Sequence, residues 1–192
     1  STGGGEILVI KHGALGDFVL SMGPFAAIRA HHREARITLL TTAPFEETAR
    51  RSGYFDRVWR DPRASAWNLP AWLGLCWRLR SAGFSRVYDL QTSRRSSAYY
   101  RYFASPRPEW SGIAKGCSHP HANPGRDAMH TVARQREQLA MASIDAVGEA
   151  DISWLDGDIS GLAPGGPFIL LVPGGAAHRP EKRWPARCYG EL

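Results

Sequence analysis

The 192-residue sequence has few cysteines, few lysines and no long apolar run. Its three cysteines form no Cys-x-x-Cys pair, which argues against a disulfide framework and against a structural zinc site. The apolar runs are too short to cross a bilayer, and no basic start followed by an apolar segment indicates a signal peptide. We therefore expect a soluble protein of a reducing, cytoplasmic compartment.

The basic residues are unusual in kind, because only three of the 24 are lysine and the formal net charge is +6. Arginine forks match the geometry of carboxylates and phosphates, so this composition suits an anionic partner. A bias in genome composition explains it equally well. Basic residues gather between Arg51 and Arg101, whereas acidic residues alone occupy the stretch 145–158.

Apolar runs of strand type alternate with segments of helical spacing along most of the chain. Ile7 to Ile10 is a continuous apolar run, which is typical of a strand buried on both faces. We expect further strands at 36–41, 57–59, 87–90, 109–113 and 168–172, and helices at 17–31, 44–52, 67–82, 93–103 and 128–142. This order predicts an α/β protein with a Rossmann-like open parallel sheet flanked by helices.

The length corresponds to one domain and a fraction of a second. We expect residues 1–5 to be a leader or the remnant of a tag, and 6–160 to form the N-terminal domain. The run Pro164-Gly165-Gly166-Pro167 indicates a boundary, so 161–192 would be a linker and the first strand and loop of a truncated second domain.

A glycine-containing loop follows the first predicted strand, at the edge where open parallel sheets bind ligands. Gly13 and Gly16 would let the backbone approach a ligand, although their spacing is neither a dinucleotide fingerprint nor a Walker A loop. Asp17 follows directly. It is either the N-cap of the next helix, which the pattern alone favours, or a carboxylate that takes a proton from a substrate hydroxyl.

A second loop, 173–185, follows the predicted strand at 168–172. Gly174, Gly175 and Ala176 expose backbone amides, and Lys182 lies among other basic residues, so the loop is a candidate phosphate cradle. An ordinary basic loop is an equally good interpretation.

Three weaker features complete the pattern. Polar residues end the fourth predicted strand, where Gln91, Arg94 and Arg95 would face the same edge, with helix capping as the alternative. The aromatic segment 67–80 is either a membrane-surface helix or, as we favour, the core face of a helix. His130 begins a helix near basic residues and is a candidate anion ligand, whereas the histidines show no metal-binding pattern.

Several of these segments resemble the bacterial ADP-heptose:lipopolysaccharide heptosyltransferases, which form glycosyltransferase family 9. The resemblance lies in Ile7-Leu8-Val9-Ile10-Lys11 with Leu15-Gly16-Asp17, in Tyr88-Asp89-Leu90-Gln91, in the helix from His130 to Leu139, and in Pro173-Gly174-Gly175-Ala176 with Glu181-Lys182-Arg183-Trp184-Pro185. It implies a GT-B fold, in which an N-terminal domain binds the acceptor and a C-terminal domain binds the nucleotide-sugar donor.

The resemblance also implies roles for individual residues. Asp17 would be the general base and Lys182 would stabilise the donor phosphates, helped by the backbone at 174–176. Acceptor binding would fall to Arg60, Arg63, Gln91, Arg94, Arg95 and His130. The implied reaction is an inverting transfer of heptose from ADP-heptose to the lipopolysaccharide inner core, Kdo-lipid A or a heptose. It needs no metal or cofactor, and peripheral contact with the inner membrane would accompany it.

The sequence also departs from the family. Lys11-His12-Gly13-Ala14 replaces a turn rich in serine and threonine, and 115–127 has no counterpart. Residues that identify the donor would lie beyond Leu192, so we expect the 192-residue chain alone to be inactive. The alternatives are a transferase with another nucleotide-sugar donor, a Rossmann-like module that binds an anion without catalysis, and, ranked last, a nucleic-acid-binding protein; we expect no nucleic-acid partner.

Overall fold

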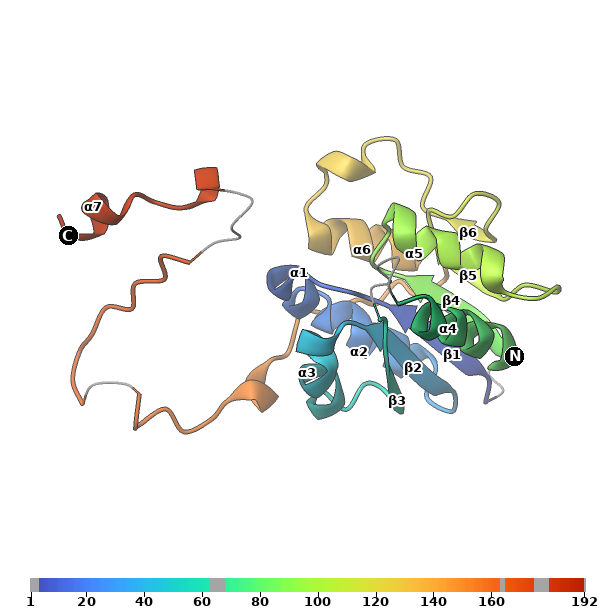
Figure 1. The fold of residues 1–192 in the computed structure, drawn as a ribbon, viewed down its shortest axis with the longest axis horizontal. Helices are drawn as coiled ribbons and strands as arrows, with labels where there is room; N and C mark the ends of the chain where they lie inside the picture. The colour runs from blue at the N-terminus through green and yellow to red at the C-terminus, as the bar shows by residue number, and fades with distance from the viewer. Residues whose placement is uncertain (1–3, 63–67, 163–164, 175–179, 192) are drawn as a thin grey trace. The chain divides into compact units, whose positions relative to one another are not determined.

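The computed structural model describes residues 4–62, 68–162, 165–174 and 180–191. By compactness the chain divides into two units, Ser1–Leu155 and Asp156–Leu192. The first unit contains a parallel six-stranded sheet in the order β3-β2-β1-β4-β5-β6 (Figure 1). The predicted α/β fold with an open parallel sheet is therefore confirmed.

The strands of the sheet are β1 (Glu6–Ile10), β2 (Arg36–Thr41), β3 (Arg57–Arg60), β4 (Phe84–Asp89), β5 (Glu109–Gly112) and β6 (His119–Pro120). The helices of the first unit are α1 (Leu15–Val19), α2 (Met22–His31), α3 (Glu46–Arg51), α4 (Leu69–Ser81), α5 (Arg94–Ala98) and α6 (Thr131–Ala140). The second unit contains α7 (Ala186–Tyr189).

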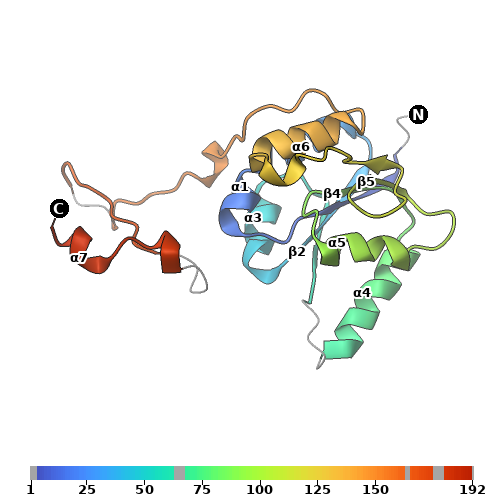
Figure 2. The same ribbon diagram turned by 90° about the horizontal axis from the view of Figure 1, so that it is seen from above.

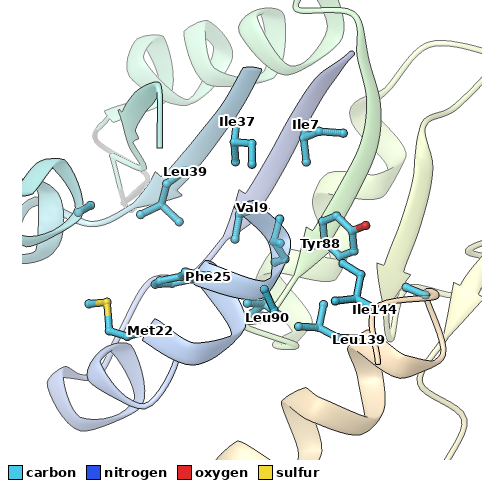
Figure 3. Packing of buried hydrophobic residues seen from close by; sticks show 14 of the residues in the cluster. Ile7, Val9, Met22, Phe25, Ile37, Leu39, Tyr88, Leu90, Leu139 and Ile144 are labelled. Carbon is cyan, nitrogen blue, oxygen red and sulfur yellow. The ribbon is translucent and has the colours of Figure 1, made fainter. Parts of the chain in front are cut away.

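β1 pairs with β2 on one side and with β4 on the other, so successive side chains of its apolar run enter two different cores. Ile7 and Val9 pack with α1, α2 and α6, as the close view in Figure 3 shows for Val9, Phe25 and Leu139. Leu8 and Ile10 enter the other core, which includes Leu75 and Leu79 of α4. Figure 2 shows α6 on the opposite side of the sheet from α4 and α5.

Two predicted helices are interrupted. The expected helix at 17–31 consists of α1 and α2, separated by Leu20 and Ser21. Pro24 lies in the first turn of α2 and has no amide hydrogen to continue the helical bonding from α1. The expected helix at 93–103 is α5 followed by a 3-10 helix at Tyr99–Tyr102.

The predicted buried strand at 168–172 is wrong. Within the described residues, Phe168, Ile169 and Val172 belong to no strand and are 52%, 88% and 73% exposed. A strand interior needs neighbouring strands for its backbone hydrogen bonds and apolar cover for its side chains. The described part of this unit pairs no strand with the run, and its apolar side chains stay exposed.

Candidate functional site

The loop after β1 is held at the carboxyl edge of the sheet by side chains that follow the two neighbouring strands, β2 and β4. The His12 amide donates to Gln91 Oε1 at 2.8 Å, and Thr42 Oγ1 donates to the His12 carbonyl at 2.8 Å. Gly13 has φ +122°, and a Cβ there would lie 2.5 Å from Phe45 Cε2, so both backbone and space demand glycine. At Gly16, by contrast, a Cβ would meet nothing within 4 Å.

Asp17 lies within α1, whose N-cap is Ala14, so the predicted N-cap role of Asp17 is wrong. The half-buried Asp17 carboxylate instead accepts a hydrogen bond from Thr131 Oγ1 through Oδ1, at 3.1 Å. Ser21 Oγ donates to the Asp17 carbonyl at 2.7 Å and accepts from Gln135 Nε2 at 2.9 Å. Helix α6 therefore positions the carboxylate, while among the described residues nothing donates to its Oδ2.

Lys11, the residue after β1, is only 3% exposed. Its Nζ donates to the Leu90 carbonyl at 3.4 Å. Burial lowers the pKa of Lys11 from 10.5 to about 8; the negative charges of Asp17 and Asp89 oppose this shift, and Arg134 adds to it. A cation with a pKa near 8 therefore lies in the electrostatic field of the Asp17 carboxylate.

Asp89 ends β4 and is fully buried. Its carboxylate accepts from the Thr92 amide at 2.9 Å and from Ser97 Oγ at 3.4 Å. Burial raises the pKa of Asp89 from 3.8 to about 6, although these hydrogen bonds oppose the shift. Asp89 thus shapes the turn into α5 and adds a second titratable group at this edge.

A second buried cluster lies at the end of β3. Asp61 Oδ2 lies 3.0 Å from His12 Nε2, Tyr99 OH donates to the same oxygen, and Arg95 donates to Oδ1. The Asp61 side chain is 0% exposed. This cluster ties the β1 loop to α5, so Arg95 has a structural partner within the chain in addition to its predicted acceptor role.

The remaining predicted site residues are more scattered. Arg60 pairs with Glu46, and Gln91 holds the His12 amide. His130 is exposed and caps α6 through Nδ1, which accepts from the Val132 amide at 3.4 Å. Arg94 is exposed at the start of α5. Arg63, Gly175 and Ala176 lie outside the described residues, Gly174 is exposed, and Lys182 ends a 3-10 helix, Pro180–Lys182, in the second unit.

Sequence reasoning missed Lys11, Asp61 and Thr131 as parts of the site. Lys11 could have been found from the sequence, because a residue directly after a buried parallel strand lies at the carboxyl edge of the sheet. Nothing local signals Thr131, which is 114 residues from Asp17 in the sequence.

The described residues contain no group of three His, Cys, Asp or Glu side chains arranged to hold a metal ion. Among the same residues, no helix is long and apolar enough to span a membrane.

Neither a family model nor a curated protein sequence matches this chain. Solved structures match its fold. E. coli ADP-heptose lps heptosyltransferase II matches with a TM-score of 0.69 and 19% identity, over 97% of this chain and 59% of that protein. A glycosyl transferase family 9 protein from Veillonella parvula matches with a TM-score of 0.64 and 14% identity, over 77% of this chain and 44% of that protein.

E. coli heptosyltransferase WaaC, solved with ADP-2-deoxy-2-fluoro heptose, matches with a TM-score of 0.58 and 16% identity, over 78% of this chain and 52% of that protein. The chain thus spans between 44% and 59% of the length of these structures. At such identities the likeness shows the fold alone. Over the matched part, the chain has the fold of these glycosyltransferases.

Proposed function

We propose that the chain takes part in an inverting transfer of heptose from ADP-heptose to the inner core of lipopolysaccharide. The observation that carries the proposal is the Asp17 carboxylate, which α6 holds at the carboxyl edge of the sheet with Oδ2 free of described donors. The heptosyltransferase folds of the similar structures support the reaction class.

The proposed reaction transfers one proton, forms one bond and breaks one bond. The acceptor hydroxyl attacks the anomeric carbon from the face opposite ADP and gives its proton to Asp17. The new carbon–oxygen bond forms as the bond to the ADP phosphate breaks, and ADP leaves with the bonding electron pair. Lys182 and the backbone at 174–176 are the proposed phosphate-stabilising groups, and the reaction uses no cofactor.

Lys11 has a positioning role in this proposal. Its pKa of about 8 leaves it largely protonated at neutral pH, so a positive charge lies in the electrostatic field of the Asp17 carboxylate. In the proposed reaction Lys11 acts on Asp17 through this charge.

The test is a transfer assay with ADP-heptose and a deacylated inner-core acceptor, run on the 192-residue chain and on the product of the complete reading frame. We expect Asp17→Asn to reduce transfer by about 100-fold or more. The matched control, Asp145→Asn, changes an exposed carboxylate elsewhere and should retain activity. Folded Asp17→Asn protein with undiminished turnover would rule out the general-base role, and turnover of ADP-glucose but not ADP-heptose would reassign the donor.

We also propose that α4 contacts the surface of an anionic bilayer, where a lipid-linked acceptor would be held. Leu69, Leu73 and Trp77 recur every fourth residue and are 55%, 53% and 69% exposed, while Leu75 and Leu79 fill the core. The sequence from Pro62 to Tyr88 contains arginines and no acidic residue. An exposed tryptophan beside cations suits the interface of an anionic membrane.

Flotation with phosphatidylglycerol vesicles tests this contact. We expect Leu73→Ser/Trp77→Ser to lose binding, whereas Met141→Ser, at an exposed apolar position outside α4, should retain it. A different outcome is that the original chain fails to bind vesicles and forms dimers that the double substitution dissociates. That result would identify α4 as an interface between copies of the chain.

A further inference from the structure

The loop 121–129, which joins β6 to α6, is fastened to a later turn of the helix that it precedes (Figure 1). His121 Nε2 lies 3.3 Å from Glu137 Oε1, and Asn123 Nδ2 donates to the same oxygen at 2.7 Å. Glu137 lies within α6, which begins at Thr131. The contact between His121 and Glu137 therefore closes a ring of residues that includes the start of α6.

The contacts of His121 require a neutral ring. Because the Glu137 carboxylate accepts hydrogen bonds, Nε2 carries the hydrogen of the ring. Nδ1 carries none, because Arg126 Nε donates to it at 3.4 Å. The His121 side chain is 0% exposed, and this burial lowers the pKa of His121 from its ordinary 6.5. Glu137 opposes the shift, whereas the charges of Arg126 and Arg134 add to it.

Protonation of the His121 ring at Nδ1 would place two cations against each other. The new N–H would face the Arg126 guanidinium, which donates hydrogen bonds and cannot accept one. From α6, Arg134 adds a second positive charge and Glu137 is the facing anion. From β5, the Gly112 carbonyl accepts from the His121 amide at 2.8 Å. A protonated ring thus loses its contact with Arg126 and keeps the one with Glu137.

The first turn of α6 depends on this loop more than the later turns do. Further along the helix, Gln138 Nε2 donates to the Asp89 carbonyl at 3.0 Å, so the later part of α6 is tied to the sheet independently. Thr131, the first residue of α6, follows the loop closely and donates to Asp17. Release of the loop would therefore free the Thr131 hydroxyl while the rest of α6 stays in place.

We propose that His121 is a positioning residue for Asp17. Its neutral ring fastens the loop 121–129 to α6, and protonation of the ring releases both the loop and the Thr131 hydroxyl. An unheld carboxylate spends less time in the orientation that receives a proton from an acceptor. The effect on transfer rests on the proposed function, whereas the release of the loop does not.

Hydrogen exchange of the 192-residue chain between pH 5 and 7.5 tests the release, with each rate divided by that of free peptide at the same pH. The released ring binds its proton more tightly than the buried ring. We therefore expect amides of 121–134 to lose up to about 10-fold of their protection per pH unit below about pH 6.5. Amides of α2 should keep theirs. His121→Gln can donate to Glu137 and accept from Arg126 without titrating, so it should show no such loss.

Two further variants keep the exchange experiment decisive. His130→Asn removes the other histidine at the start of α6 but keeps a side-chain cap, so the loss of protection should persist. Arg126→Gln removes the repelling cation and should reduce the loss, which decides the matter where His121→Gln does not fold. The proposal would be overturned by a loss that is absent from the original chain, equal in α2, unchanged in His121→Gln or abolished by His130→Asn.

Transfer by the product of the complete reading frame tests the positioning role. Between pH 7.5 and 5.5 we expect kcat to fall more steeply in the original protein than in His121→Gln, by up to about 10-fold, with equal KM for ADP-heptose. Equal kcat profiles, beside a loss of protection in the original chain, would overturn the positioning role. No transfer by either protein at any pH would contradict the proposed function, while the loss of protection around Thr131 would still support the release.

Discussion

Two apolar runs in this chain resemble each other in sequence and differ in structure. Ile7–Ile10 becomes the central strand β1 and is buried on both faces, whereas Phe168–Val172 forms no strand and stays exposed. The difference lies in the neighbours, because β1 has β2 and β4 beside it and a helical layer over each face. An apolar run therefore specifies that a segment can be buried, while its partners decide whether it is.

The largest expected effect comes from placing a charge in each run. Val9→Asp buries a carboxylate at a position that is 0% exposed, which costs more than the marginal stability of a domain, so we expect no cooperative unfolding transition. Ile169→Asp, at 88% exposure, should leave the transition unchanged. Urea unfolding followed by circular dichroism measures both, and an equal response of the two variants would abolish the contrast.

Hydrogen exchange sharpens the same comparison without any substitution. Amides of β1 and β4 should exchange only through global unfolding, several orders of magnitude slower than free peptide. Amides at 168–172 have no described ladder partner and should exchange close to the free rate. Mass spectrometry of peptides from the two runs reads this directly; slow exchange at 168–172 would mean that the segment has found a partner.

Titration of Lys11 provides a third contrast, because the packed run ends in a buried cation and the exposed run does not. The folded pKa of Lys11 is about 8 against 10.5, so between these values the unfolded chain binds more protons and stability rises with pH. We expect the stability of the original chain to gain up to about 3 kcal/mol relative to Lys11→Met across this window.

Urea unfolding at pH 7 to 10.5 measures the gain. Lys115→Met, at an exposed lysine, should show no such trend. A stability difference between Lys11→Met and the original chain that does not change with pH would contradict the shifted pKa.

The smallest expected change in unfolding free energy comes from comparing a buried carboxylate with an exposed one. Asp61→Asn weakens the bonds to Arg95 and Tyr99 and should cost about 2 kcal/mol of unfolding free energy. Asp158→Asn, in the second unit, should leave the transition of the first unit unchanged. Chemical denaturation of the two variants decides; equal stabilities would show that the Asp61 cluster adds nothing to the fold.

Sequence patterns predicted β1 and β2 well because both are short apolar runs, whereas β6 (His119–Pro120) carries no such run and was not predicted. They also placed Asp17 and the glycine loop at the carboxyl edge of the sheet, because the carboxyl ends of all parallel strands lie at that one edge. They failed at 168–172, because an apolar run does not show which neighbouring strands are present to pair with it. The pairing of Asp17 with Thr131 was equally out of reach, as it depends on how α6 returns across the sheet.

The position of β1 between β2 and β4 has a consequence for the order of synthesis. When β1, β2 and β3 have left the ribosome, Lys11 still lacks the Leu90 carbonyl, 79 residues on, and Asp17 lacks Thr131, 114 residues on. Half of the sheet can thus pair while the Asp17 carboxylate is still unheld. The carboxylate reaches its final position only after α6 has been translated, so half of the sheet can form before Asp17 is held in place.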